Sequence, residues 1–509
     1  MEAWTIIMLS IPLLYLIIKI ITLRVVHVKS PSLPPGPMHI PLITNIICLT
    51  TYSSFSKLRP LLPRLHAKHG PIITLPIWSG PHIFIADASL AHQALLQNAA
   101  VFANRPYKTL STIHRQLNIT SSPYGPTWRL LRRNLTSYIL QPSFSSLRKS
   151  VLRDLLTRLK LSITASSSSS SSSIRVDDHV HDAVLSMLVF MCFGDEIQEN
   201  KIHHMKRIQR ALISGFNRFS VLNFLPRVVY RVVFPQRCKE YLHLREQQKL
   251  AFKEVMEERR LSRKNKDDKT FVFYVDTLLE LVLPAENNRK LEEDEVISLC
   301  SEFLSAGTDT TSTALEWIVA NLVKYPLIQT RLADEIAEVV RERGGNDDEV
   351  EEEDLEKLPY LKAVILEGLR RHPPSHFLLP HAVTEDTVLN GYLIPKKATV
   401  NFTVAEMGWD PKVWEDPMGF KPERFLNAEE FGASGKKEIN NKMMPFGAGR
   451  RMCPAYGLAM LHLEYLVANL VLAFKWSTVH GGDALDLSEK QGFTTAMKHP
   501  LHARISPRF

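Results

Sequence analysis

Apolar residues recur with a helical period over most of the chain, and β-type patterns occupy only short stretches. Two β-type runs within 72–86 flank Ser79-Gly80-Pro81, which is a hairpin signal. Further short β-type runs alternate with turns such as Asn390-Gly391 over 377–404. Helical patterns are expected over 127–140, 293–323 and 359–371 and after Cys453. The patterning therefore predicts a mainly α-helical protein with smaller β-sheets.

The N-terminal stretch is far more apolar than the rest. Residues 4–23 are apolar apart from Ser10, Lys19 and a few hydroxyl side chains, and this length can span a bilayer as a helix. A basic start and a small-residue cleavage site are both missing, which favours an uncleaved anchor over a signal peptide. Basic residues follow directly and place the main body in the cytosol. We predict a membrane anchor in 1–29; the alternative is a buried core helix.

A proline-rich segment separates this anchor from the body. Residues 30–37, SPSLPPGP, form a stiff extended joint that cannot continue a helix. Residues 166–173 are eight consecutive serines, and we interpret them as an inserted surface loop because helical patterns resume directly after them. The expected organisation is an anchor (1–29), a hinge (30–37) and one large domain (38–509).

The charge and cysteine content limit the kinds of binding partner and cellular compartment that we expect. The net charge of +9 favours acidic partners or anionic membrane surfaces. Residues 200–264 are rich in Lys and Arg but lack a compact basic motif, so we expect solvated helix faces and no nucleic-acid partner. The acidic run 346–354 is expected to be a solvated loop. The five cysteines form no CxxC and no zinc spacing, which indicates a reducing compartment.

Cys453 has the most suggestive setting of the five. It follows a loop of glycines and arginines and precedes a long apolar helix, in which Pro454 fits the first position. Backbone N–H groups at a helix start favour a thiolate, which suits a soft transition metal or a nucleophilic role. Arg450 and Arg451 could pair with an anionic group that arrives with the metal. The alternative is a buried structural cysteine in a tight turn.

A hydroxyl-rich segment interrupts the pattern of 293–323. Glycine and clustered threonines in 306–311 weaken a helix locally, and we expect the helix to be broken or widened there. Asp309 and Thr310 place an acid beside an alcohol within an apolar helix, where they could relay protons into a dry cavity. The alternative is a hydroxyl-rich helix crossing without chemistry.

Glu367 and Arg370 lie on one face of the helix expected over 359–371. At i,i+3 they can form a charge-assisted pair, and the apolar residues around them favour burial. A buried arginine needs further partners, and the segment 420–425 with Arg424 could supply carbonyl and charged groups.

Taken in order, these motifs resemble those of the cytochrome P-450 family, in particular its plant A-type microsomal members. The resemblance covers nearly the whole chain, including the anchor and the proline-rich joint. It rests on Phe446-x-x-Gly449-x-Arg451-x-Cys453 as the haem-binding loop, Glu367-x-x-Arg370 with the PERF stretch at Pro422, Ala306-Gly307-x-Asp309-Thr310 in the oxygen-activating helix, and Trp128-x-x-x-Arg132.

The resemblance implies a role for each matching residue. Cys453 would be the thiolate ligand of the iron in heme b (iron protoporphyrin IX). Asp309 and Thr310 would deliver protons during oxygen activation. The remaining cofactor-binding residues would be Arg451, Phe446, Trp128, Arg132 and His381.

The resemblance also implies the reaction and its partners. We expect a monooxygenase that inserts one atom of dioxygen into an apolar small molecule, with electrons from an NADPH-cytochrome P-450 reductase. The enzyme would sit on the endoplasmic reticulum membrane, anchored in membrane lipid, with its catalytic domain in the cytosol. Phe377, Leu378, Leu379 and Phe493 suggest an apolar or aromatic substrate but do not identify it. An acidic reductase could dock on Arg129, Arg133, Lys436, Lys437 and Lys442.

Two positions depart from the family pattern. Ala455 stands where glycine is usual, and we expect haem binding to survive the extra methyl group. His381 stands where many members have arginine, so its contact with the haem is expected to weaken as the pH rises through the histidine range.

Three other functions stay open at this point. A related isomerase or dehydratase that rearranges peroxides would have little need of the Asp309-Thr310 pair. A non-catalytic haem-binding or scaffold protein would need neither this pair nor the cysteine loop. A cysteine hydrolase would need a histidine near Cys453, and His462 lies about two and a half helical turns further on.

Overall fold

The computed structural model describes most of the chain after the predicted hinge. The described residues are 32–37, 58–77, 80–106, 117–138, 144–165, 173–194, 197–215, 218–219, 231–265, 272–344, 349–426, 442–479 and 485–508. The predicted anchor in 1–29 and all but the last residue of the poly-serine run lie outside these residues.

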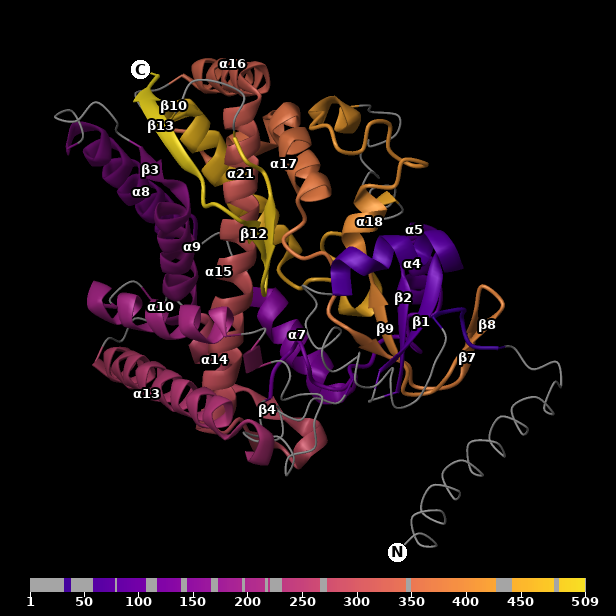
Figure 1. The fold of residues 1–509 in the computed structure, drawn as a ribbon. Coiled ribbons are helices and arrows are strands. Elements are labelled where there is room, and N and C mark those ends of the chain that lie inside the picture. The colour runs from indigo at the N-terminus through magenta and orange to yellow at the C-terminus, as the bar shows by residue number, and fades with distance from the viewer. Residues whose placement is uncertain are drawn as a thin grey trace, which may run out of the picture.

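Helices dominate the described chain (Figure 1). The α-helices are α4 (Leu62–His69), α5 (Ala88–His92), α7 (Pro126–Tyr138), α8 (Ser145–Ala165), α9 (Val176–Phe193), α10 (Glu199–Ser214), α13 (Pro235–Asn265), α14 (Tyr274–Glu280), α15 (Glu293–Lys324), α16 (Pro326–Arg343), α17 (Pro359–Arg371), α18 (Val404–Gly408) and α21 (Tyr456–Ala473). Shorter turns are η2 (Arg59–Leu61), the π-helix η3 (Gln93–Gln97), η6 (Pro284–Glu286), η7 (Glu352–Lys357), η8 (Pro422–Phe425) and η9 (Gly449–Arg451). The predicted mainly helical fold is confirmed.

The strands form small separate sheets. The largest sheet among the described residues has the order β1 (Ile72–Ile77), β2 (Gly80–Ile85), β9 (Thr399–Phe402), β6 (His381–Ala382). A second has the order β10 (Phe474–Thr478), β13 (His502–Pro507), β3 (Ile174–Arg175). Hairpins pair β4 (Val282–Leu283) with β5 (Arg289–Lys290), β7 (Thr387–Leu389) with β8 (Tyr392–Ile394), and β11 (Glu489–Gln491) with β12 (Thr495–Met497).

Both predicted hairpins are present. Strands β1 and β2 pair antiparallel from Ile72 opposite Ile85 to Ile77 opposite Gly80. Gly80 and Pro81 of the predicted turn belong to β2, and residues 78–79 lie outside the described residues. Between β7 and β8, Asn390 and Gly391 have positive φ angles of 50° and 79°, as a two-residue type I′ turn requires.

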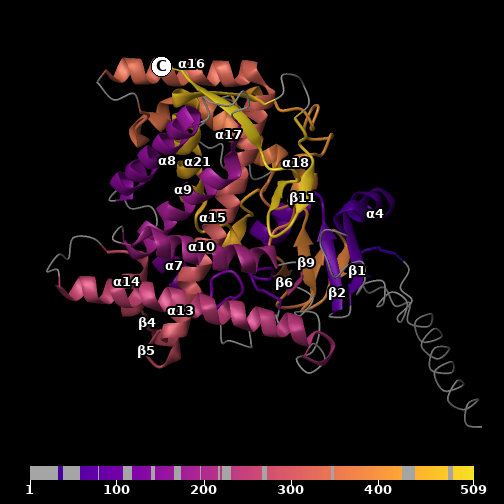
Figure 2. The ribbon, with the colours of Figure 1, turned by 60° about the vertical axis from the view of Figure 1, so that its left-hand side comes forward.

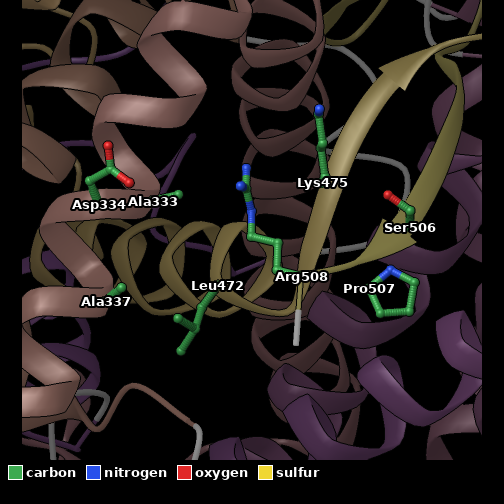
Figure 3. A pocket seen from close by; sticks show the side chains of 8 residues that line it. All are labelled: Ala333, Asp334, Ala337, Leu472, Lys475, Ser506, Pro507 and Arg508. Atoms are coloured by element: carbon green, nitrogen blue, oxygen red, sulfur yellow. The ribbon is translucent and has the colours of Figure 1, made fainter.

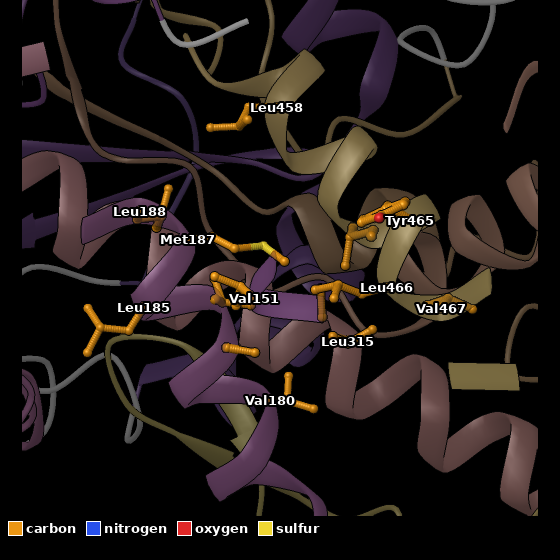
Figure 4. Packing of buried hydrophobic residues seen from close by; sticks show 14 of the residues in the cluster. Val151, Val180, Leu185, Met187, Leu188, Leu315, Leu458, Tyr465, Leu466 and Val467 are labelled. Atoms are coloured by element: carbon orange, nitrogen blue, oxygen red, sulfur yellow. The ribbon is translucent and has the colours of Figure 1, made fainter. Parts of the chain in front are cut away.

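Helix α15 runs through the middle of the molecule, with α8, α9, α10 and α13 on one side and the β1–β2–β9 sheet on the other (Figures 1 and 2). It contacts both α9 and α21. Buried aliphatic side chains from α8, α9, α15 and α21 fill the space between these helices, among them Val151, Leu188, Leu315 and Leu466 (Figure 4). Removal of this apolar surface from water is the main force that holds the helices together.

The expected break in the long helix is wrong. Residues 306–311 are regular α-helix within α15. The hydroxyl of Thr310 donates to the Ala306 carbonyl at 2.6 Å, and that of Ser312 donates to the Thr308 carbonyl at 2.8 Å. These hydroxyl groups are satisfied inside the helix, so the helix does not need to open to accommodate them.

The predicted pair of Glu367 and Arg370 is buried, with both side chains at 0% exposure. Arg370 donates to both carboxylate oxygens of Glu367, at 2.7 and 2.8 Å. Its remaining donors reach carbonyls that lie just before the PERF segment, those of Gly408, Pro417 and Gly419, at 2.7 to 3.0 Å. Nε of Arg424 lies 3.4 Å from a carboxylate oxygen of Glu367. The network ties α17 to the segment that leads into η8.

The acidic run is not a plain solvated loop, because its described part binds α8. Arg148 pairs with Glu352 through two hydrogen bonds of 2.7 and 2.8 Å, and Arg153 pairs with Glu349 at 3.0 Å. Within the basic segment 200–264, Arg259 of α13 pairs with Asp276 at 2.8 Å. Some of its basic side chains are therefore bound within the fold.

The described part of the hinge is bonded to the main body. The carbonyl of Ser32 accepts from the Leu393 N–H and that of Pro35 accepts from the Thr74 N–H, both at 2.9 Å. By length and composition one described helix, α21, could cross a membrane, but 67% of that span is buried in the protein. Helix α21 is therefore a core helix.

We predict that Arg370→Leu lowers the free energy of unfolding by about 3–5 kcal/mol, because Glu367 would remain buried without its partner. Urea denaturation measures this. Arg331→Leu is the control, since it removes an exposed pair with Glu423 and should cost less than about 1 kcal/mol. Equal losses in the two variants would contradict the structural role of the buried pair.

Candidate active site

The cysteine loop is closed on itself by backbone geometry. The Cys453 N–H donates to the Phe446 carbonyl at 2.9 Å, and the loop between them includes η9. Gly447 and Gly449 have positive φ angles of 71° and 68°, which side-chain-bearing residues rarely adopt. A Cβ atom on Gly449 would lie 1.9 Å from the Leu95 carbonyl oxygen of η3. The loop can therefore pack against η3 only with glycine at this position.

Helix α21 begins later than expected. Its first residue is Tyr456 and Ala455 caps it, so Pro454 precedes the helix and does not occupy its first position. Burial raises the pKa of the Cys453 thiol, while a hydrogen bond from the Ala455 N–H and the nearby Arg132 charge lower it. Burial therefore outweighs the helix terminus that was expected to favour the thiolate. Ala455 has φ −96° and ψ 22°, which any L-residue can adopt, so its methyl group causes no backbone strain.

Arg451 lies beside the cysteine loop and is 9% exposed. Its guanidinium donates to the carbonyls of Ala103 at 2.6 Å, Ile119 at 3.2 Å and Ser122 at 2.7 Å. Burial and the nearby charge of Arg132 lower the pKa of Arg451 to about 10. The side chain is thus held firmly, but backbone dipoles rather than a carboxylate balance its charge.

Arg105 completes this cluster, and the motif analysis did not assign it a role. It donates to the carbonyls of Thr120 at 2.9 Å, Leu379 at 2.7 Å and Pro380 at 2.9 Å. Burial and the charge of Arg451 lower the pKa of Arg105 to about 9. Within the described part of the chain, no ion pair is recorded for Arg105, Arg132 or Arg451. Three neighbouring cations without a carboxylate partner have the charge that an anionic group would need.

The residues predicted on α7 lie at the same place. Trp128 is buried, and its indole N–H donates to the Ile119 carbonyl at 2.9 Å. The guanidinium carbons of Arg132 and Arg451 lie 5.5 and 4.2 Å from the centre of its ring. Phe446 packs edge-on against Tyr456, with ring centres 4.9 Å apart. The structure therefore gathers Trp128, Arg132, Arg451 and the cysteine loop.

His381 is also part of this cluster, but it is not poised to titrate near neutral pH. It is 3% exposed and its Nδ1 lies 2.7 Å from the Phe102 carbonyl. Burial, together with the charges of Arg105 and Arg451, lowers the pKa of His381 to about 3. This low value applies without an anionic partner, so the expected weakening of a cofactor contact through the histidine range stays a prediction.

The predicted acid and alcohol lie in the middle of α15. The Asp309 carboxylate lies 3.8 Å from Nε2 of His181 on α9. His181 is buried, and its Nδ1 has no hydrogen-bond partner in the structure. No pattern in the sequence pointed to His181, because α9 and α15 are more than one hundred residues apart.

Hydrogen bonds join the C-terminal hairpin to α15 and to the segment after α17. The Thr313 hydroxyl of α15 donates to the Thr494 hydroxyl at 3.1 Å, and Trp317 of α15 donates to the Thr495 carbonyl at 2.8 Å. The Thr495 N–H in turn donates to the Pro374 carbonyl at 2.7 Å. The β11–β12 hairpin is thereby fixed between α15 and the segment after α17.

A family model described as Cytochrome P450 matches residues 34–504. The chain belongs to the cytochrome P450 family. It is 47% identical over 496 residues to Cytochrome P450 89A9 of Arabidopsis thaliana, covering 94% of each chain. It is 30% identical to geraniol 8-hydroxylase of Catharanthus roseus, covering 93% of this chain and 94% of the relative.

The fold agrees with a solved P450. A zebra fish cytochrome P450 solved with progesterone has a TM-score of 0.72 and 24% identity, and the match covers 89% of this chain and 99% of that one. Membership of the family makes this protein a P450 monooxygenase and implies a haem-thiolate cofactor. Within this P450, the cysteine loop and the cation cluster are the parts that could hold such a group.

A separate cavity of about 320 Å³ lies elsewhere, between α16, the end of α21 and strands β10 and β13 (Figure 3). Leu472 lines it, and this residue is about 24 Å along α21 from the end that adjoins Cys453. Arg508 faces this cavity but already donates to the Val471 carbonyl at 2.8 Å and to Gln329 at 3.0 Å. The cavity is therefore distinct from the cysteine site.

We predict that Gly449→Ala lowers the free energy of unfolding of this P450 by at least about 3 kcal/mol. The new Cβ would overlap the Leu95 carbonyl, and the positive φ at this position would also strain an alanine. Gly447→Ala is the matched control: it has a similar φ, but its nearest neighbour would be 3.5 Å away. It should cost only about 1–2 kcal/mol. Thermal unfolding compares the two, and equal losses would contradict the close packing of the loop on η3.

His462 supplies a pH prediction. Burial lowers its pKa to about 3, with a smaller contribution from the Arg148 charge. The folded protein keeps His462 neutral, so it is fully stable above about pH 6.5 and loses stability as the pH falls towards the folded-state pKa. At about pH 5 the free energy of unfolding should be about 2 kcal/mol lower than at neutral pH.

His462→Leu should remove this loss. We expect its free energy of unfolding to fall by about 2 kcal/mol less than that of the wild type between about pH 7.5 and pH 5, measured by urea denaturation at each pH. Parallel pH curves for the two proteins would show that His462 is not held neutral.

Proposed function

We propose that this P450 binds heme b through Cys453 and inserts one atom of dioxygen into an apolar small molecule, with electrons from an NADPH-dependent reductase. The observation that carries the proposal is a buried cysteine in a rigid loop beside a cluster of arginines that lacks a carboxylate partner. A metal porphyrin with acidic side chains matches both features.

The residues present fit such a group. A soft thiolate suits iron, and a coordinated metal cation would lower the thiol pKa that burial raises. Two propionates could pair with the guanidinium groups of Arg105, Arg132 and Arg451 and offset two of their three positive charges. A guanidinium is suited to this task because it remains charged even when burial lowers its pKa to about 9, as in Arg105. When bound, haem supplies the chemistry of dioxygen activation.

His381 could also contact an acidic group of the cofactor. The Phe102 carbonyl can only accept, so the ring proton of neutral His381 sits on Nδ1 and Nε2 is left as an acceptor. Nε2 could donate only after the ring gains a second proton. A propionate at Nε2 would favour that second proton and so raise the pKa of His381 from its low value.

The proposed proton route runs along α15. Thr310 holds its hydroxyl against the Ala306 carbonyl at 2.6 Å, so its oxygen keeps lone pairs that can accept a proton from a neighbour. Asp309 can carry a proton on its carboxylate and lies 3.8 Å from His181. Asp309 and Thr310 would therefore pass protons towards the place where dioxygen is activated, while the apolar packing of α15 excludes bulk water.

The substrate assignment goes no further than an apolar small molecule. The chain is 30% identical to geraniol 8-hydroxylase of Catharanthus roseus. It is 31% identical to 5-epiaristolochene 1,3-dihydroxylase of Nicotiana tabacum. These names support a plant specialised metabolite as the substrate. The phenylalanine and leucine residues at 377–379 and Phe493, on segments that the structure gathers near α15, agree with such a guest.

The location remains part of the proposal. A microsomal enzyme would be held on the endoplasmic reticulum membrane by the anchor in 1–29, with its catalytic domain in the cytosol. The hydrogen bonds that join Ser32 and Pro35 to the main body would then keep that domain close to the membrane surface.

The alternatives lose support for specific reasons. A peroxide isomerase or dehydratase would not need an acid and an alcohol adjacent on α15. A passive haem-binding scaffold would need neither these residues nor a reductase. A hydrolase would need a base beside Cys453, whereas His462 is buried in the core with a pKa of about 3.

The proposal predicts three outcomes for the purified, membrane-reconstituted enzyme with reductase. The wild type should give the reduced carbon monoxide difference spectrum of a thiolate-bound haem, and Cys453→Ser should lose it. Thr310→Ala and Asp309→Asn should keep that spectrum but make about 10²-fold less product per NADPH consumed, because proton delivery fails.

A matched variant on the same helix provides the control. Thr313 also carries a hydroxyl on α15 but bonds the β11–β12 hairpin, so Thr313→Ala should change coupling far less than Thr310→Ala.

The double variant Arg129→Glu with Arg133→Glu tests the proposed reductase face, because both of these side chains are exposed. Lys436 and Lys437 of that face lie outside the described residues. Full turnover with Cys453→Ser, or unchanged coupling with Thr310→Ala, would contradict the proposal.

A further inference from the structure

One short loop lies between α15 and the arginine cluster. Residues 118–122 form a turn in which the Asn118 side chain accepts from the Ser121 N–H at 2.8 Å and from the Ser121 hydroxyl at 2.5 Å. This turn directs the N–H groups of Ile119 and Thr120 to one side and their carbonyl groups to the other.

A single carboxylate binds the N–H side of the loop. Glu302 of α15 accepts from the Ile119 N–H at 2.6 Å, the Thr120 N–H at 2.8 Å and the Thr120 hydroxyl at 2.5 Å. Hydrogen bonds to an ionised acceptor are shorter and stronger than neutral ones, and three of them converge here.

The carbonyl side of the same loop binds the cations. The Ile119 carbonyl accepts from Trp128 at 2.9 Å and from Arg451 at 3.2 Å. The Thr120 carbonyl accepts from Arg105 at 2.9 Å, and the Ser122 carbonyl accepts from Arg451 at 2.7 Å. The peptide groups of the loop therefore stand between one carboxylate and two guanidinium groups.

We propose that Glu302 is a positioning residue for the cofactor: it fixes this loop so that Arg105 and Arg451 are held ready for the propionates. The inference rests on the proposed haem site, which supplies the anionic group. Glu302 acts through the loop and does not itself contact the cofactor. Its role is to hold two mutually repelling cations in place before the anion arrives.

Two physical effects support this role. The Thr120 N–H and the Ile119 carbonyl belong to one peptide group, so the carboxylate of Glu302 polarises that group and makes its carbonyl a better acceptor for Arg451. Glu302 also lies two turns before Asp309 and Thr310 on α15, so the loop is fixed to the helix that bears the proposed proton route. The cation cluster and that helix are thereby joined as one unit.

The experiment measures haem release from the purified holoenzyme into excess apomyoglobin, together with the unfolding midpoint of each variant. Glu302→Gln removes the charge and one acceptor oxygen. Thr120→Val removes only the hydroxyl donor and serves if Glu302→Gln does not fold. Glu295→Gln is the matched control on α15, because Glu295 also binds two donors of one arginine, Arg289, at 2.7 and 2.8 Å but does not reach the loop.

We expect Glu302→Gln to release haem about tenfold faster than the wild type, in line with the loss seen when supporting contacts around a metal site are removed. Thr120→Val should release it about threefold faster, as expected for one of three hydrogen bonds. Glu295→Gln should lower the unfolding midpoint without comparable acceleration. In an Arg105→Gln background, Glu302→Gln should add less than about twofold, because both changes act through the same loop.

Haem release at the wild-type rate from Glu302→Gln, or from Thr120→Val if the first variant does not fold, would overturn the inference. Independent, multiplying effects of Glu302→Gln and Arg105→Gln would also overturn it, since they would indicate a general structural role. A wild-type protein that binds no haem would instead contradict the proposed function, so the two failures can be told apart.

Discussion

Buried positive charge without a carboxylate partner is the constraint on which the site depends. The charge of Arg451 lowers the pKa of Arg105, the charge of Arg132 lowers that of Arg451, and within the described chain Arg105 and Arg451 donate to backbone carbonyls. Carbonyl dipoles stabilise such charges but do not neutralise them. A cluster of this kind is costly for the folded protein until an anionic group binds, and the same cost becomes binding energy when it does.

The surrounding fold holds that cluster in place from several directions. Helix α7 contributes the Trp128 ring, β6 contributes His381, and η9 delivers Arg451 from the cysteine loop. Gly449 lets that loop approach η3, and the buried Arg370 network fixes α17 and the segment before η8. Helix α15 carries both Glu302, which binds the loop 118–122, and the proposed proton-carrying residues. The cation cluster and α15 are therefore supported by the same frame.

Sequence reasoning succeeded where the signal is local and periodic. The limits of α17, the Asn390-Gly391 turn and the pair of Glu367 with Arg370 follow from spacing along one element, so they were predicted correctly. Reasoning was weaker where an energy balance decides the outcome. The hydroxyls of α15 bond within the helix instead of opening it, Pro454 precedes α21, and the acidic run binds α8 because basic side chains there face it.

Contacts between distant segments could not be read from any local pattern. Arg105 and Glu302 meet opposite sides of one loop only after three parts of the chain have folded together. His181 and Asp309 are likewise joined by the packing of α9 on α15. Burial also sets the pKa of His381 and Cys453, and burial is a property of the whole fold, whereas the motif showed only residue types and their spacing.

The central claim is that the uncompensated arginines are a preformed site for the acidic groups of the cofactor. A crystal structure of the haem-loaded enzyme tests this most directly. The account predicts iron bound to the Cys453 sulfur, with both propionates hydrogen-bonded within the cluster of Arg105, Arg132 and Arg451. Propionates directed away from that cluster, with the arginines still bound only to backbone carbonyls, would contradict it.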